Sequence, residues 1–311
     1  MHNNIDANMR TPLKTLAGLA FAALTLLPVA AQAGTASTYA QTRYPIVLVH
    51  GLMGFDDILG SDYFYRIPDD LRANGATVLV AAVSAVNDND VRGEQLLQQL
   101  KQWSASKGYE KFNLIGHSQG GPTARYTAGV APALVASVTT VGSPHSIPVG
   151  QSSPDAVMQL LNSSPATVKF IGNMVAFLSG HSKLPQDPAA LKAWADNTAA
   201  FNARFPAGAP TSHCGEGPET AANGVHYYSA TGNMPKTNKW DIADLLMNAS
   251  DQPSDGLVPV CSTKWGKVLR ADYPWNHFDE INQVFGLLGK GAPDPVLFYR
   301  QQANRLKLKG L

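Results

Sequence analysis

Phe112-Asn-Leu-Ile-Gly-His-Ser-Gln-Gly-Gly121 joins an apolar, β-rich run to a segment with the pattern of a helix. At its centre is G-x-S-x-G, which places Ser118 between a predicted strand and a predicted helix. A sharp turn from strand to helix brings neighbouring backbone too close for side chains, so glycines are needed there. The Ser118 hydroxyl would then be exposed at the edge of a sheet, facing the positive end of the following helix. The stretch therefore predicts a nucleophilic serine, with a plain glycine-rich turn as the alternative.

Short apolar runs alternate with helical patterns along much of the chain. This alternation predicts the α/β class, with a mostly parallel sheet and helices on both faces. Residues 151–205 are rich in Ser, Pro and Ala and break the rhythm, which indicates a helical insertion and not a second domain. The expected strands cover residues 45–50, 76–83, 112–115, 135–141, 224–230 and 257–260, and the expected helices include 90–104 and 121–130.

The composition excludes several classes of protein. Of the 311 residues, 44% are hydrophobic and 15% are charged, and 24 Lys and Arg nearly balance 23 Asp and Glu. So low a charged fraction argues against a disordered chain, a nucleic-acid-binding protein and a polybasic membrane-surface protein. The chain is long enough to bury a large core.

The first 33 residues have the pattern of a secretory signal peptide. Arg10 and Lys14 precede an apolar stretch at 16–31, and Ala31-Gln-Ala33 has the form of a cleavage site. A retained membrane anchor is the alternative, but the apolar stretch is short for a bilayer span. We therefore expect residues 34–311 to form a secreted, extracellular catalytic domain without a stable transmembrane anchor.

Cys214 and Cys261 are the two cysteines of the chain. In an exported protein, two thiols most simply form one disulfide. The bridge would close a loop of about 48 residues, which the chain-entropy model values at roughly 4 kcal/mol. Two buried free thiols are the alternative.

A nucleophilic serine needs a base, and five histidines follow Ser118. In a fold of this type the expected chain order is serine, then an acid, then histidine. His277 lies nearest the C-terminus, in Asn276-His-Phe-Asp-Glu280 and just before a helical pattern, and is therefore the predicted base. His145 follows a strand and is expected to line the same cleft in another role. The remaining three are expected to be surface or packing residues: His181, His213 and His226.

The predicted acid is Asp255, in the turn Ser254-Asp-Gly-Leu-Val258. Its task would be to hold the tautomer of the imidazole and to stabilise the imidazolium. A simple Asp-Gly turn is the alternative reading of the residue. By chain order alone four rivals stay open: Asp241, Asp244, Asp251 and Asp272.

An oxyanion hole needs two backbone N–H donors. One is expected from Gln119, the residue after the nucleophile, and the other from the loop after an early strand. That loop is His50-Gly-Leu-Met-Gly54, in which Leu52 is the predicted donor. His50 is out of order for a catalytic base and is expected to be a structural hydrogen-bonding residue.

Four segments together resemble the secreted, foldase-dependent bacterial triacylglycerol lipases, the family I true lipases of the α/β-hydrolase superfamily. They are Tyr44-Pro-Ile-Val-Leu-Val-His-Gly51, Val91-Arg-Gly-Glu-Gln-Leu-Leu97, Asn113-Leu-Ile-Gly-His-Ser118 and Asn276-His-Phe-Asp-Glu280. The resemblance runs from about Ser37 to near the C-terminus. It implies the α/β-hydrolase fold and a dedicated foldase as a partner during export. Separately, we expect the protein to be a monomer. The resemblance assigns the functional positions to Ser118, Asp255 and His277, to Leu52 and Gln119, and to a Cys214–Cys261 disulfide.

The resemblance also implies one structural Ca²⁺ ion. Its ligands would be Asp241, Asp279, Gln283 and the backbone carbonyl of Leu287, and oxygen ligands of this type suit calcium. Asp279 and Gln283 are four residues apart and are expected on one face of a helix. Two alternatives stay open: Asp244 competes with Asp241, and Asp279 could instead cap a helix.

Apolar residues recur at helical spacing in the insertion, at Val168, Ile171, Met174, Val175 and Leu178. Such a stripe normally packs on a core. Above Ser118 it could form a lid that opens at an oil surface. The leading hypothesis is therefore a lipid-ester hydrolase that acts through an acyl-enzyme. The alternatives are a general carboxylesterase, a polyester hydrolase, or a non-catalytic binding protein of the same fold.

Overall fold

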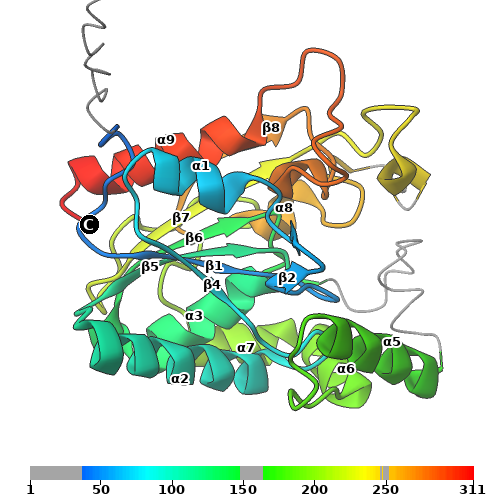
Figure 1. Ribbon diagram of the computed structural model, residues 1–311, viewed down its shortest axis with the longest axis horizontal. Helices are drawn as coiled ribbons and strands as arrows, with labels where there is room; N and C mark the ends of the chain where they lie inside the picture. The colour runs from blue at the N-terminus through cyan, green and yellow to red at the C-terminus, as the bar shows by residue number, and fades with distance from the viewer. Residues whose placement is uncertain (1–36, 148–163, 246, 248–251) are drawn as a thin grey trace, which may run out of the picture. The chain divides into compact units, whose positions relative to one another are not determined.

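The computed structural model describes residues 37–147, 164–245, 247 and 252–311. Six strands form one parallel sheet in the order β4-β1-β5-β6-β7-β8, and helices lie above and below it (Figure 1). The predicted α/β class is confirmed. In sheet order the strands are Val78–Ala81, Ile46–Val49, Phe112–His117, Val135–Val141, His226–Gly232 and Lys267–Tyr273, and Asp57–Ile58 (β2) with Ser61–Asp62 (β3) forms a separate hairpin.

The two faces of the sheet carry two cores. Along β1, Ile46 and Leu48 pack with α1 and α9, whereas Val47 and Val49 pack with α2 and α3. Because side chains alternate along a strand, a strand covered on both faces reads as a continuous apolar run. The four helices are α1 (Ile67–Ala73), α9 (Pro295–Leu308), α2 (Asn89–Lys107) and α3 (Gly120–Val130).

The strand order places one pair of loops side by side. From β1 the chain crosses to β4 on one side, and from β5 it continues to β6 on the other side. Ligands of such sheets bind outside the carboxyl ends of the strands, where the winding direction changes. The loop that begins at His50 and the turn at Ser118 therefore meet at the expected position for a site.

The segment between β6 and β7 contains helices and no strand within its described residues. The short turn η1 (Pro132–Leu134) precedes β6, and α5 (Pro165–Leu178), α6 (Pro188–Asp196) and α7 (Thr198–Arg204) follow it. Helices α5 and α6 share a small core with Val86. Residues 148–163 of the expected insertion, and the expected signal peptide at 1–33, lie outside the described residues. Within the described ranges, no helix has the length and apolarity to cross a bilayer.

Two local predictions were wrong. Val260 begins a four-residue helix, α8 (Val260–Thr263), where a strand was predicted over 257–260. Pro259 lacks an N–H for a sheet ladder and makes a single isolated bridge instead. After His277 the chain forms only the short turn η3 (Asp279–Ile281), so the helical pattern predicted there does not become a helix.

Cys214 and Cys261 form the expected disulfide. The bridge ties α8 to the loop that precedes β7. Another short turn, η2 (Ile242–Leu245), lies between β7 and α8. The disulfide therefore restrains the connection that carries Asp255.

Candidate active site

Ser118 occupies the turn between β5 and α3. Its φ is +53°, in the left-handed region that residues other than glycine rarely adopt, and its side chain is half-buried. A Cβ on Gly120 would lie 2.1 Å from the carbonyl oxygen of Val49, and one on Gly116 would lie 2.3 Å from that of Gly120. The close approach of β1, β5 and α3 therefore requires both glycines, and it holds the serine in a strained turn.

Asp255 and His277 are hydrogen-bonded partners. Nδ1 of His277 lies 2.7 Å from Oδ2 of Asp255, and the His277 amide donates to the Asp255 carbonyl. Oδ1 of Asp255 accepts from the amides of Leu257 and Val258, at 2.8 and 2.7 Å. Both side chains are buried, and because a carboxylate oxygen can only accept, Nδ1 of His277 is the donor in this hydrogen bond.

The loop that carries His277 packs against the serine turn. His117, which directly precedes Ser118, has its ring centroid 4.5 Å from that of His277. Nε2 of His117 lies 3.0 Å from the His277 carbonyl oxygen and must be its donor. Oγ of Ser118 makes no hydrogen bond to another described residue, as is common in ligand-free sites of this chemistry.

A chain of hydrogen bonds joins the loop after β1 to His277. The Gly51 amide donates to the Tyr63 hydroxyl at 3.2 Å, and Tyr63 lies 2.8 Å from Nδ1 of His117. Since Nε2 of His117 donates to His277, Nδ1 must accept the Tyr63 proton. Burial lowers the pKa of His117 well below the ordinary range, which keeps this ring neutral.

The backbone donors expected for an oxyanion hole lie beside this chain. Neither the Leu52 amide nor the Gln119 amide is used in a hydrogen bond between described residues, whereas the Met53 amide donates to Ala85. Free N–H groups are what an oxyanion hole requires.

Arg92 holds the loop after β1 in place by hydrogen bonds. This role was not predicted from the sequence. The fully buried guanidinium donates to the carbonyls of His50 and Ser84 and to the Thr123 hydroxyl. Burial lowers its pKa to about 9. His50 acts as the predicted structural residue, because Nδ1 lies 2.9 Å from the Gly51 carbonyl oxygen and Nε2 accepts from the Val83 amide.

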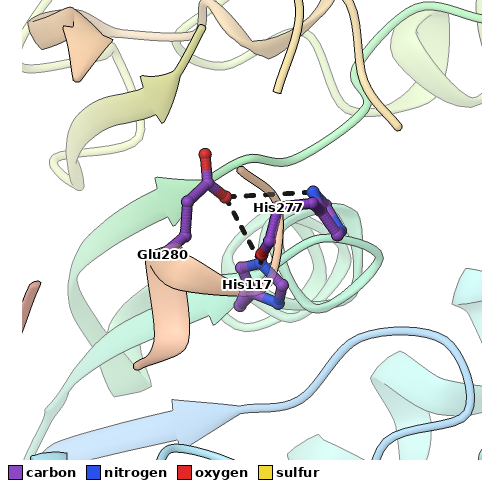
Figure 2. A group of neighbouring side chains, drawn as sticks. All are labelled: His117, His277 and Glu280. Atoms are coloured by element: carbon purple, nitrogen blue, oxygen red, sulfur yellow. Dashed lines mark hydrogen bonds and ion pairs between the residues drawn. The ribbon is translucent and has the colours of Figure 1, made fainter. Parts of the chain in front are cut away.

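Glu280 is a buried acid that the sequence analysis missed. One oxygen accepts from the Gly232 amide at 2.6 Å, and the other lies 3.3 Å from Nε2 of His117 and 3.9 Å from Nδ1 of His277 (Figure 2). Burial, and then the negative charge of Asp255, raises the pKa of Glu280 well above its ordinary range. This shift favours the protonated, uncharged form of the carboxyl group.

His117, His277 and Glu280 form a group that could hold a metal ion. Each offers one ligand atom, and these atoms lie within 4.8 Å of one another. Figure 2 shows the carboxyl group of Glu280 facing both imidazoles. In the hydrogen-bond pattern above, however, Nε2 of His117 and Nδ1 of His277 carry protons, which a metal would have to displace. The Glu280 oxygen that faces the two rings is buried and has no hydrogen-bond partner among the described residues.

Asp241 and Asp279 form a second buried acidic group. Oδ2 of Asp241 and Oδ1 of Asp279 are buried and have no hydrogen-bond partner among the described residues. Burial raises the pKa of both, that of Asp279 to about 7, and the negative charge of Asp241 contributes to the latter shift. A cation would remove the cost of these unpartnered oxygens, so the pair fits a metal site.

The other two expected metal ligands lie in an irregular segment. Asn282, with φ of +59°, ends η3, so Asp279 and Gln283 do not share a helical face as predicted. Nε2 of Gln283 donates to the carbonyls of Asp62 and Tyr63, both at 2.8 Å. Leu287 follows in the same loop.

The remaining histidines lie elsewhere. His145 is buried, and its Nδ1 lies 3.1 Å from Nη1 of Arg125. Its amide donates to the Ser262 carbonyl, so the residue belongs to the packed interior. His181 is paired with Asp56, His226 lies near Thr220, and His213 is exposed.

The rival acids have other surroundings. Asp244 accepts from two backbone amides and from Asn276, and Asp272 is exposed beside Arg270. Asp251 lies outside the described residues.

The sheet, the serine turn at its carboxyl edge and the buried Asp–His pair define a hydrolase of the α/β type. Residues 44–299 match the family model described as alpha/beta hydrolase fold. The Staphylococcus hyicus lipase has a similar fold, with a TM-score of 0.56 at 18% identity over 85% of this chain and 95% of that one.

Two bacterial relatives are much more similar in sequence. A triacylglycerol lipase of Vibrio cholerae is 48% identical over 286 residues, which cover 88% of this chain and 90% of the relative. A triacylglycerol lipase of Burkholderia plantarii is 40% identical, over 93% and 96% of the two chains. This chain is thus an enzyme of the α/β-hydrolase fold family and belongs, within it, to the family of these bacterial lipases.

Proposed function

We propose that this protein hydrolyses the fatty-acid esters of glycerol, through a Ser118–His277–Asp255 triad and an acyl-enzyme. The observation that carries the proposal is the buried His277–Asp255 pair, 2.7 Å apart, in a loop packed against the strained Ser118 turn. Relatives named triacylglycerol lipase, aligned over most of the chain, support the choice of substrate.

In the proposed reaction, Oγ of Ser118 attacks the ester carbonyl carbon while its proton passes to Nε2 of His277. Asp255 holds the imidazole by Nδ1 and stabilises the imidazolium that forms. The amides of Leu52 and Gln119 donate to the oxyanion, a role in which each donor is worth about 10²–10³ in rate. His277 then gives the proton to the leaving alcohol. Water, activated in the same way, releases the acid from Ser118.

Calcium forms part of the proposal. Asp241, Asp279, Gln283 and the carbonyl of Leu287 would hold one ion, and the buried unpartnered oxygens of the two acids support this assignment. The ion would neutralise those acids and restrain the loop that carries His277, only two residues from Asp279. Its role would be structural.

Export is the remaining part. Residues 1–33 would act as the signal peptide, and residues 34–311 would be secreted as a monomeric catalytic domain with a mobile lid within about 151–205. A dedicated foldase would assist folding on the way out. The Cys214–Cys261 disulfide supports passage through an oxidising compartment.

A covalent fluorophosphonate probe tests the catalytic part. We expect it to label the native protein and not Ser118→Ala, and we expect His277→Ala to lose labelling as well. Long-chain triacylglycerol emulsions should be cleaved faster than short nitrophenyl esters. Faster cleavage of the short esters would favour a general esterase, and an unlabelled native protein would favour a non-catalytic binder.

A further inference from the structure

The turn at residues 239–245, here called the Trp240 turn, presents three large apolar side chains to solvent. Trp240 is 74% exposed, Ile242 68% and Leu245 84%. In the same turn Asp241, Ala243 and Asp244 are buried. This is the reverse of the usual arrangement, in which apolar side chains are buried and acids face water.

The buried acids enforce this inversion. Oδ1 of Asp241 accepts from the Ala243 amide at 2.7 Å, and Oδ2 of Asp244 accepts from the amides of Thr237 and Asn238, both at 2.9 Å. Oδ1 of Asp244 accepts from the side chain of Asn276, the neighbour of His277. The bond between Asp244 and Asn276 thus fastens the turn to the interior, and the apolar side chains next to the two buried acids point outward.

Two exposed lysines lie in the chain next to these side chains. Lys236 and Lys239 are exposed, and neither forms an ion pair with a described residue. Nζ of Lys239 lies 5.3 Å from the centroid of the Trp240 ring. Tryptophan, aliphatic side chains and lysine together are the composition that anchors proteins at a membrane–water interface.

We propose that the Trp240 turn is a lipid anchor, which inserts Trp240, Ile242 and Leu245 into a negatively charged lipid surface. The surface rests on the proposed function: it is that of the ester substrate, made negative by the fatty acids that hydrolysis releases. Lys236 and Lys239 complement that charge. The enzyme therefore binds more tightly where its own product has accumulated.

The location of the turn agrees with this role. Figure 1 shows the Trp240 turn, in yellow, and helix α5, in green, at the same end of the described unit. Helix α5 exposes a second apolar face, with Phe170 68% and Phe177 71% exposed. Two elements with exposed apolar side chains thus lie at the same end of the described unit.

Binding to vesicles tests the anchor without catalysis. The full chain carrying Ser118→Ala is mixed with phosphatidylcholine vesicles, with and without oleic acid. We expect tighter binding to the oleic acid vesicles, and a blue shift of fluorescence on binding that is absent after Trp240→Phe. Ile242→Ser with Leu245→Ser should weaken binding by roughly tenfold or more. Lys236→Gln with Lys239→Gln should weaken binding only to the negative vesicles.

Leu308→Ser is the matched control, because Leu308 is an equally exposed leucine, 78%, on α9. It should leave vesicle binding unchanged, and all variants should keep the parent melting temperature. Unchanged binding of the Ile242 and Leu245 double variant would overturn the proposal. So would concentration-dependent dimers of the parent that this variant abolishes, since the turn would then bind a second copy. Neither result changes the labelling of native Ser118 by the fluorophosphonate probe. The proposed function and the proposed anchor are therefore tested independently.

Discussion

Tyr63 connects two parts of the site through a single hydroxyl. It accepts from the Gly51 amide and donates to His117, which in turn holds the carbonyl of His277. The residue touches no expected reacting atom, so its contribution would be to position groups that do. Gly51, Tyr63 and His117 are separated in the chain, and the fold brings them within hydrogen-bonding distance.

Tyr63→Phe should lower kcat about tenfold or more while leaving KM for a short soluble ester nearly unchanged. The substitution leaves a buried amide and a buried imidazole nitrogen without partners, at roughly 1–3 kcal/mol each. Steady-state kinetics of the variant checks this, with Tyr39→Phe, at an exposed tyrosine, as the control. A Tyr63→Phe variant with the kcat of the parent would contradict the inference that Tyr63 positions the catalytic groups.

At this scale the sequence identified some residues and missed others for a physical reason. Ser118 lies in a local pattern, and His277 was predicted from chain order. Asp255 was predicted from its turn, because chain order alone left four rival acids open. Arg92 and Glu280 contact residues tens of positions away or more, and their burial has no local signal. A lone Arg or Glu in sequence is normally a surface residue.

Helix α5 is apolar on two faces, and the structure separates them. Val168 is buried in the small core shared with α6 and Ala176 is also buried, while Phe170 and Phe177 face solvent. Only Val168 of the predicted stripe is buried; Ile171 and Val175 are partly buried, and Met174 and Leu178 are exposed. Helical periodicity marks residues that share a side, without saying what covers it. The strand predicted at 257–260 is absent for a different reason. Pro259 has no N–H to donate to a sheet, although the residues around it are apolar.

Phe170→Ser with Phe177→Ser should cut hydrolysis of a triacylglycerol emulsion by about tenfold and leave a soluble short ester almost unaffected. The exposed face would otherwise contact the oil, and each side chain contributes through its buried area. Paired assays on the two substrates measure the effect. Equal losses on both would mean that α5 is a fixed packing helix. Val168→Ser is the contrasting variant, because a polar group in the small core should lower the melting temperature.

At the scale of the whole molecule, the topology of the sheet determines which loops meet at the carboxyl ends of its strands. Parallel order and a change of winding direction bring the loops after β1 and β5 together, and this much follows from the alternation of strands and helices. The position of Asp241 beside Asp279 does not follow from it, because neither residue belongs to a strand or to a regular α-helix. Irregular backbone lacks the periodic signal that predicts helices and strands.

Removal of calcium should lower the melting temperature by about 5–10 °C. An ion present at a hundred times its dissociation constant contributes about 2.7 kcal/mol, and each kcal/mol corresponds to roughly 2–4 °C in a domain of this size. Thermal unfolding with a chelator, and then with calcium restored, measures the change. Asp241→Asn should abolish the response, and Asp272→Asn, at an exposed acid, should retain it. A chelator without effect on the parent would contradict the assignment.

The hydrogen-bond chain from Gly51 to His277 has one further consequence. None of its links is ionised, because burial holds the pKa of His117 down and the pKa of Tyr63 up. As pH falls through the ordinary histidine value near 6.5, the unfolded chain takes up a proton that the folded His117 refuses, so acid lowers stability. As long as the protein stays folded, this hydrogen-bond chain stays intact. Because no link of this chain carries a charge, salt has nothing to screen in it, whereas exposed ion pairs such as Arg204 with Asp90 weaken as the ionic strength rises.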